Sequence, residues 1–137
     1  MQTNVIFGRP CSGKTKYIID FLNGWSGKSL FVNVETSEAF IRKRGLTSSV
    51  VIDSLDKMTL HGIIDAVKDS GATAVAIDYL ELLPEEVDLR SLNKALESIG
   101  VKQVMIAAQL RYQDLKPVSA KRLEGIEYTE MVLGGGG

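Results

Sequence analysis

The residues best suited to chemistry lie near the N-terminus, in the run Gly8-Arg9-Pro10-Cys11-Ser12-Gly13-Lys14-Thr15. Glycines at this spacing let the backbone curl and point successive N–H groups inward at phosphate oxygens. Lys14 can then reach the β- and γ-phosphates of a nucleotide, and the hydroxyl of Thr15 can bind Mg²⁺. The pattern G-x-x-x-x-G-K-[ST] is complete. The run therefore predicts a phosphate-binding loop, with ATP and Mg²⁺ as ligands.

The sequence on either side supports this interpretation. The apolar run Val5 to Phe7 comes before the loop, and apolar residues at helical spacing follow it, so the loop joins a strand to a helix that begins at about Lys14. The positive end of that helix adds to the attraction for phosphate. The alternative is a glycine turn with an exposed lysine. The expected nucleotide-binding residues are Gly8, Arg9, Pro10, Cys11, Ser12, Gly13, Lys14, Thr15 and Lys16.

Three polar residues stand at the ends of other predicted strands. Asp78 follows the apolar run 75–77, where a carboxylate can order the Mg²⁺ shell together with Thr15, or else serve as a turn residue or helix cap. Glu35 ends the run 30–34 and could act as the general base toward water, or equally be a surface glutamate. Gln109 could sense the γ-phosphate through a hydrogen bond.

The elements that must position these residues alternate along most of the chain. Short apolar runs predict strands, and apolar stripes with helical spacing predict helices. This alternation indicates an α/β fold of three layers, a mainly parallel sheet with helices on both faces. Ligands of such sheets bind beyond the carboxyl ends of the strands. The expected strands are 5–7, 29–34, 50–52, 74–77, 104–108 and 127–133, and the expected helices start near 14, 37, 60 and 89.

Length and composition fit one domain, which we expect to span residues 1–133 with a glycine tail at 134–137. A net charge of −1 gives no general attraction to nucleic acid or to anionic membrane. With a single cysteine and neither a signal-like N-terminus nor a membrane-length apolar run, we expect a cytoplasmic protein that does not enter membranes.

The stretch 109–125 has no clear periodicity, and long loops of this kind are usually functional or mobile. Its four cations outnumber its two carboxylates, and an aromatic side chain there could stack on a base. We therefore consider single-stranded DNA as a partner, against the alternative of a solvated loop that binds nothing. The candidate contacts are Arg111, Tyr112, Lys116, Lys121 and Arg122.

Together the motifs resemble the RecA-like core of DnaB-type replicative helicases, from about Val5 to Leu133. The resemblance implies that Glu35 is the catalytic base, that Asp78 binds the metal and that Gln109 belongs to the glutamine motif. It also implies DNA replication or recombination as the setting, and a homo-oligomer or a larger helicase as partner. The similar segments are Gly8 to Thr15, Val34 to Ser37, Ile77 to Leu83, Ala108 to Leu110 and Arg122 to Glu127.

Several departures from that family change what we expect. The segment between Leu83 and Arg90 is shorter, Ala108 replaces the usual serine, and Arg111-Tyr112 replaces Asn-Arg. The family's N-terminal domain and linker helix have no counterpart, and the chain stops before the segment that carries the arginine finger. Because that finger completes the site of a neighbouring subunit, we expect slow hydrolysis by this chain alone.

Three functions remain open from the sequence. The first is a minimal DnaB-like ATPase that acts on single-stranded DNA. The second is a nucleotide-dependent regulatory module with little hydrolysis, which the neutral charge and the missing finger favour. The third is a small-molecule kinase, which we rank last because the segment Ile77 to Leu83 is helicase-like.

Overall fold

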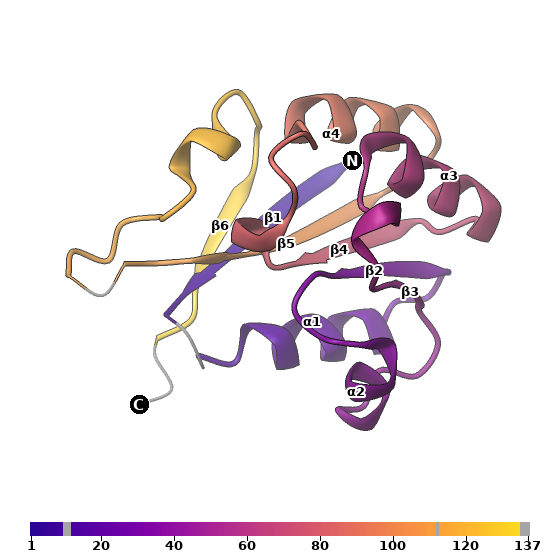
Figure 1. The fold of residues 1–137 in the computed structure, drawn as a ribbon, viewed down its shortest axis with the longest axis horizontal. Coiled ribbons are helices and arrows are strands. Elements are labelled where there is room, and N and C mark those ends of the chain that lie inside the picture. Colours follow the sequence, from indigo (N-terminus) through magenta and orange to yellow (C-terminus); the bar gives the residue numbers. More distant parts are fainter. Residues whose placement is uncertain (10–11, 112, 135–137) are drawn as a thin grey trace.

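The computed structural model describes residues 1–9, 12–111 and 113–134. Within these ranges, strands and helices alternate along the chain (Figure 1). The strands are β1 (Gln2–Gly8), β2 (Ser29–Asn33), β3 (Val50–Ile52), β4 (Ala74–Asp78), β5 (Gln103–Gln109) and β6 (Thr129–Val132). The helices are α1 (Lys14–Asn23), α2 (Glu38–Lys43), α3 (Leu60–Ser70) and α4 (Leu89–Ser98), with short 3₁₀ turns η1 (Leu55–Lys57), η2 (Leu80–Leu82) and η3 (Ala120–Leu123).

The strands form one sheet in the order β3-β2-β4-β5-β1-β6, and every pair is parallel. All carboxyl ends therefore lie at the same edge. Strand β5 runs between β1 and β4, with Gly8 opposite Gln109 and Ala107 opposite Asp78. Strand β2 continues the row, with Asn33 opposite Asp78. This register brings the loop after β1 close to the ends of three other strands.

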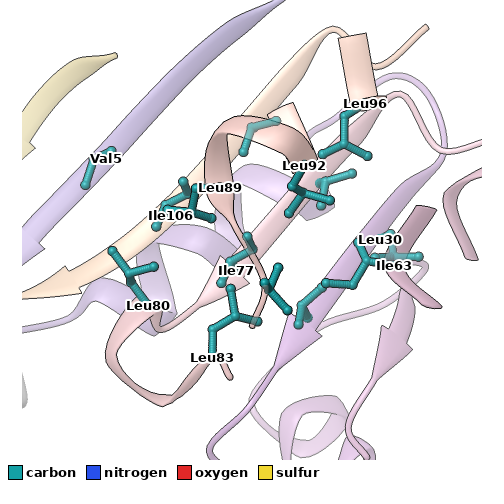
Figure 2. Close-up of a cluster of buried hydrophobic side chains, with 14 of the residues drawn as sticks. Val5, Leu30, Ile63, Ile77, Leu80, Leu83, Leu89, Leu92, Leu96 and Ile106 are labelled. Atoms are coloured by element: carbon teal, nitrogen blue, oxygen red, sulfur yellow. The ribbon is translucent and has the colours of Figure 1, made fainter. Parts of the chain in front are cut away.

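Alternating side chains of each central strand cover the two faces of the sheet. On one face, Leu30, Ile77 and Ile106 pack with residues of α3 and α4, such as Ile63 and Leu92 (Figure 2). The opposite face is covered by α1 and α2, through apolar residues that include Ile18, Leu22 and Ile41. Figure 1 shows the two pairs of helices on opposite sides of the sheet. The predicted α/β class with three layers is confirmed.

The face of the sheet toward α1 and α2 carries three small side chains beside larger ones such as Ile6 and Phe31. On the face toward α1, the central strands carry Ala74, Ala76 and Ala107, all buried. Because interiors pack densely, these small side chains leave room for a helix to lie close to the sheet. Helix α1 therefore packs directly on the sheet, with the loop at its start.

Side-chain caps set the starts of the other helices. Ser37, Thr59 and Asp88 accept the amide hydrogens of Phe40, Gly62 and Ser91 at 3.3, 2.9 and 3.1 Å. Each cap satisfies a backbone donor that the helix leaves unpaired.

Two regions differ in detail from the sequence expectation. The last strand is shorter than 127–133, and the stretch 109–125 is partly structured, with a bridge between Leu110 and Pro117 and the turn η3. No helix in the described part of the chain is both long and apolar enough to cross a bilayer.

Candidate phosphate-binding site

The predicted loop lies between the end of β1 and the start of α1, and two glycines are required by its shape. Gly13 has a φ of 92°, the left-handed region that glycine adopts without strain. A Cβ atom at Gly8 would collide with the side chain of Ser12. As a glycine, Gly13 offers no side chain to cap the first N–H groups of α1. Those amides are therefore suited to an anion at this helix end.

Lys14 is buried, with 6% of its surface exposed, and its ammonium group lies within the curve of the loop. The Nζ atom donates to the carbonyl oxygens of Gly8 and Arg9 at 3.0 and 2.7 Å, and to Ser12 Oγ at 3.3 Å. It also lies 3.4 Å from Gln109 Oε1. The structure thus brings together two of the predicted site residues, Lys14 and Gln109.

The two residues predicted to bind the metal are in direct contact. Thr15 Oγ1 donates to Asp78 Oδ2 at 2.7 Å. Asp78 is buried, and its other oxygen, Oδ1, has no hydrogen-bond donor among the described residues. A buried carboxylate oxygen without a donor is costly unless a cation binds it. The pair therefore fits a metal ligand set.

Burial raises the pKa of Asp78 above its ordinary value of 3.8. The hydrogen bond from Thr15 lowers it, the charge of Glu35 raises it, and the cations Lys14 and Arg44 lower it. Glu35 and Arg44 therefore both lie near enough to Asp78 to change its pKa. A divalent cation would reverse the dominant effect and favour the ionised form.

A cavity of about 480 Å³ joins these groups, and its volume is in the range of small-molecule sites. Glu35 lines it, as predicted for a residue at the tip of β2. The cavity is lined by Ser12, Gly13, Lys14, Thr15, Lys16, Glu35, Arg44, Asp78, Tyr79 and Gln109.

The described residues hold no cluster of three or more His, Cys, Asp or Glu side chains that could bind a metal by themselves. Mg²⁺ is commonly held by one or two protein oxygens together with substrate phosphates and water. Thr15 and Asp78 would be the protein ligands in such a site.

Three residues of the site were not predicted. Arg44 and Tyr79 line the cavity, and Glu81 Oε1 accepts the backbone N–H of Gln109 at 2.9 Å. Glu81 lies inside the aspartate motif, so its position was a usable signal. For Arg44 the sequence gives no signal, because only the fold brings the end of α2 to the cavity.

The candidate nucleic-acid residues have different surroundings. Arg111 pairs with Asp114 at 2.8 Å, while Lys116 and Lys121 are exposed. Arg111 also lines a second cavity, of about 440 Å³, which shares Tyr79 and Gln109 with the first. The remaining predictions for this site, Tyr112 in the loop and Pro10 and Cys11 in the phosphate loop, fall outside the described residues, as do residues 135–137 of the glycine tail.

Arg122 has a structural role instead of a surface one. Its guanidinium group donates to four backbone carbonyls, at 2.6 to 3.2 Å. These donors hold the segment that follows Asp78 in place, so the guanidinium group is not available as a nucleic-acid contact. The four carbonyls belong to Leu80, Leu83, Pro84 and Val87.

Replacing Arg122 by alanine is therefore expected to lower the free energy of unfolding by about 2–3 kcal/mol, because charged hydrogen bonds to partly buried carbonyls are lost. Denaturant unfolding measures the change, and the exposed neighbour variant Lys121→Ala should stay within about 0.5 kcal/mol of wild type. Equal stabilities for the two variants would contradict the structural role.

Replacing Asp78 by asparagine is expected to stabilise the nucleotide-free chain by about 1 kcal/mol at neutral pH, because a buried charge is removed. With the pKa raised in the folded state, that state binds more protons than the unfolded one above pH 3.8. The stability of wild type therefore falls as the pH rises through this window. Thermal melts from pH 4 to 8 should show the gain of Asp78→Asn growing with pH. A gain that shrinks with rising pH would contradict this assignment.

A scan against protein-family models finds no match for this chain, and a search of curated proteins finds none either. The functional interpretation therefore depends on the geometry of the site: a three-layer parallel α/β fold with a glycine-lined loop at a helix N-terminus, and a threonine–aspartate pair beside it.

Proposed function

We propose that the chain is an ATP-binding P-loop ATPase of the DnaB-helicase-like type. The hydrogen bond between Thr15 and Asp78, at 2.7 Å beside the buried Lys14, carries this proposal. Residues 63 positions apart meet at the place where a Mg²⁺ ion on the β- and γ-phosphates would need its protein ligands.

Each residue has a distinct task in this proposal. The amides at the start of α1 bind phosphate oxygens, and Lys14 exchanges its carbonyl partners for phosphate. Mg²⁺, when bound, neutralises charge on the β- and γ-oxygens. Glu35 accepts a proton from the attacking water, and Gln109 contacts the terminal phosphate from the end of β5.

We further propose that single-stranded DNA binds beside the second cavity, in DNA replication or recombination in the cytoplasm. The sharing of Tyr79 and Gln109 between the two cavities supports this, since DNA and nucleotide would then contact the same residues. Arg111, Lys116 and Lys121 supply positive charge for the backbone. A homo-oligomer or a larger helicase is the corresponding assembly.

A regulatory module with little hydrolysis is the second candidate. The ion pair between Arg111 and Asp114 favours it, because a neutralised arginine attracts phosphate less strongly. In that case ATP binding would change the conformation of the chain for a protein partner.

The test measures ATP binding and turnover by the full chain, with Mg²⁺ or EDTA, and with or without single-stranded DNA. We expect Mg²⁺-dependent binding, and DNA binding that weakens steeply with salt. Tight ATP binding with negligible turnover at every protein concentration would favour the module. No ATP binding would overturn both candidates.

A further inference from the structure

Arg44 follows the last residue of α2, and its side chain lines the same cavity as Lys14 and Asp78. Within the described part of the chain, the guanidinium group of Arg44 makes no hydrogen bond or ion pair. The cavity thus contains an arginine with its donors available.

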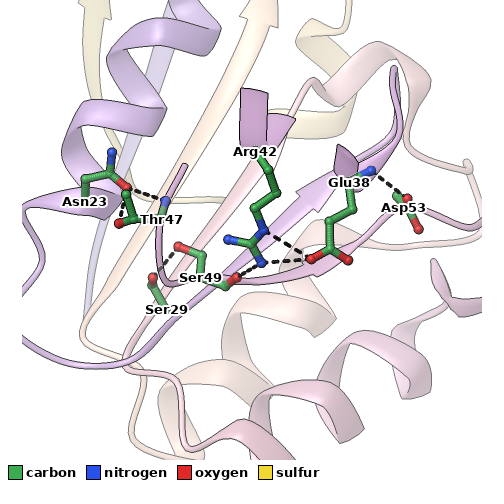
Figure 3. Close-up of polar contacts among 7 residues, drawn as sticks. All are labelled: Asn23, Ser29, Glu38, Arg42, Thr47, Ser49 and Asp53. Carbon is green, nitrogen blue, oxygen red and sulfur yellow. Dashed lines mark hydrogen bonds and ion pairs between the residues drawn. The ribbon is translucent and has the colours of Figure 1, made fainter. Parts of the chain in front are cut away.

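The neighbouring cations of α2 differ from Arg44. Arg42 is engaged by Glu38 at 2.9 Å and by the carbonyl oxygen of Ser49 at 2.6 Å, contacts that Figure 3 shows. Lys43 and Arg44 are both exposed, but Lys43 is not part of the cavity lining. Of these three consecutive cations, only Arg44 faces the phosphate-binding site.

The backbone at Arg44 is held on both sides. Its N–H group donates to the carbonyl oxygens of Phe40 and Ile41, both at 3.1 Å, which closes the end of α2. In the turn that follows, the Gly45 carbonyl oxygen accepts from Asn23 Nδ2 at 2.8 Å, and the Thr47 amide donates to Asn23 Oδ1 at 3.0 Å. Asn23 and Thr47 are seen together in Figure 3. These hydrogen bonds hold the backbone of Arg44 in place beside the cavity.

We propose that Arg44 binds the terminal phosphate of the nucleotide, as a cation supplied by the same chain. This inference rests on the proposed ATP site. Thr15 and Asp78 mark the end of the cavity that would hold the β- and γ-phosphates, because they would hold the Mg²⁺ ion that offsets the charge of those phosphates. Arg44 lines the same cavity as these two residues, and a planar guanidinium can give two parallel hydrogen bonds to one phosphate.

The consequence concerns hydrolysis. A cation near the γ-phosphate stabilises the charge that develops as the phosphoryl group is transferred. With Arg44 in this position, turnover per chain should not depend on protein concentration. This differs from the expectation, drawn from the sequence, that hydrolysis by this chain alone is slow.

The test compares the affinities for a non-hydrolysable ATP analogue and for ADP, by calorimetry with Mg²⁺, in wild type, Arg44→Ala, Arg44→Lys and Lys43→Ala. We expect Arg44→Ala to weaken the analogue about tenfold and ADP less than about twofold. Arg44→Lys should lie between, because lysine keeps the charge and loses the paired geometry. The adjacent control Lys43→Ala should match wild type for both ligands.

Two outcomes overturn the inference alone: Arg44→Ala behaves like Lys43→Ala, or it weakens ADP as much as the analogue. Each outcome is interpreted beside a measurement of Lys14→Ala. If wild type binds the analogue and Lys14→Ala does not, the proposed ATP site stands and only the role of Arg44 is wrong. If wild type binds neither ligand, the proposed function fails and the inference fails with it. Thermal melts of each variant identify any loss of binding that comes from unfolding.

Discussion

Lys14→Ala is expected to abolish nucleotide binding, with an affinity at least about 100-fold weaker than that of wild type. The ammonium group is the central cation of the loop, held at 3.0 and 2.7 Å from two loop carbonyls and reaching toward Gln109. Removing it takes away charged hydrogen bonds to two phosphates and leaves the loop carbonyls facing them. Calorimetric titration with ATP and Mg²⁺ measures the change.

Lys68→Ala is the matched control, since Lys68 is an exposed lysine of α3, on the opposite face of the sheet from α1. It should bind ATP as wild type does. Thermal melts should show that Lys14→Ala is still folded. A folded Lys14→Ala protein with wild-type affinity would remove the basis of the ATP site.

Glu35→Gln is expected to lower turnover by about 100-fold or more and to leave ATP affinity within about twofold of wild type. A general base contributes about 10²–10⁴ in rate, and glutamine cannot accept the proton of the attacking water. Glu35 lines the cavity from the residues that follow β2 and is not part of the phosphate loop, so binding should persist. Single-turnover hydrolysis and a binding titration separate the two effects.

An exposed glutamate of β6 provides the control for this change. Glu130→Gln, at the sheet edge away from β2 and its following Glu35, should keep both affinity and turnover. If Glu35→Gln hydrolyses ATP as fast as wild type, the general-base role of Glu35 is wrong. If it loses binding as well, Glu35 acts mainly in binding.

The sequence was sufficient to predict the fold class and the meeting of the main site residues. In a parallel sheet the carboxyl ends lie at one edge, so the sequence alone predicts Asp78 and Gln109 beside the loop. The order of the strands was not predictable in this way. It is the position of β5 between β1 and β4 that brings Gln109 within 3.4 Å of Lys14.

Two arginines show what the sequence could not decide. Arg122 lies in a basic stretch, and its charge suggested a surface contact, but it binds carbonyls 35 to 42 positions earlier in the chain. Arg44 looks like an ordinary cation in a helix end, yet tertiary packing turns it toward the cavity. Neither fact depends on local pattern, because both follow from how distant segments pack.

The contact between Asn23 and the turn after Arg44 links the end of α1 to that turn. Helix α1 has ten residues and a length of about 15 Å, with the phosphate loop at its start and Asn23 at its end. A shift of the loop on ligand binding would move α1 as a rigid body. Asn23 would then transmit that shift to the turn at Gly45 and Thr47 through its hydrogen bonds. A change in hydrogen exchange at the Thr47 amide on nucleotide addition would show that the bond to Asn23 responds to the phosphate loop.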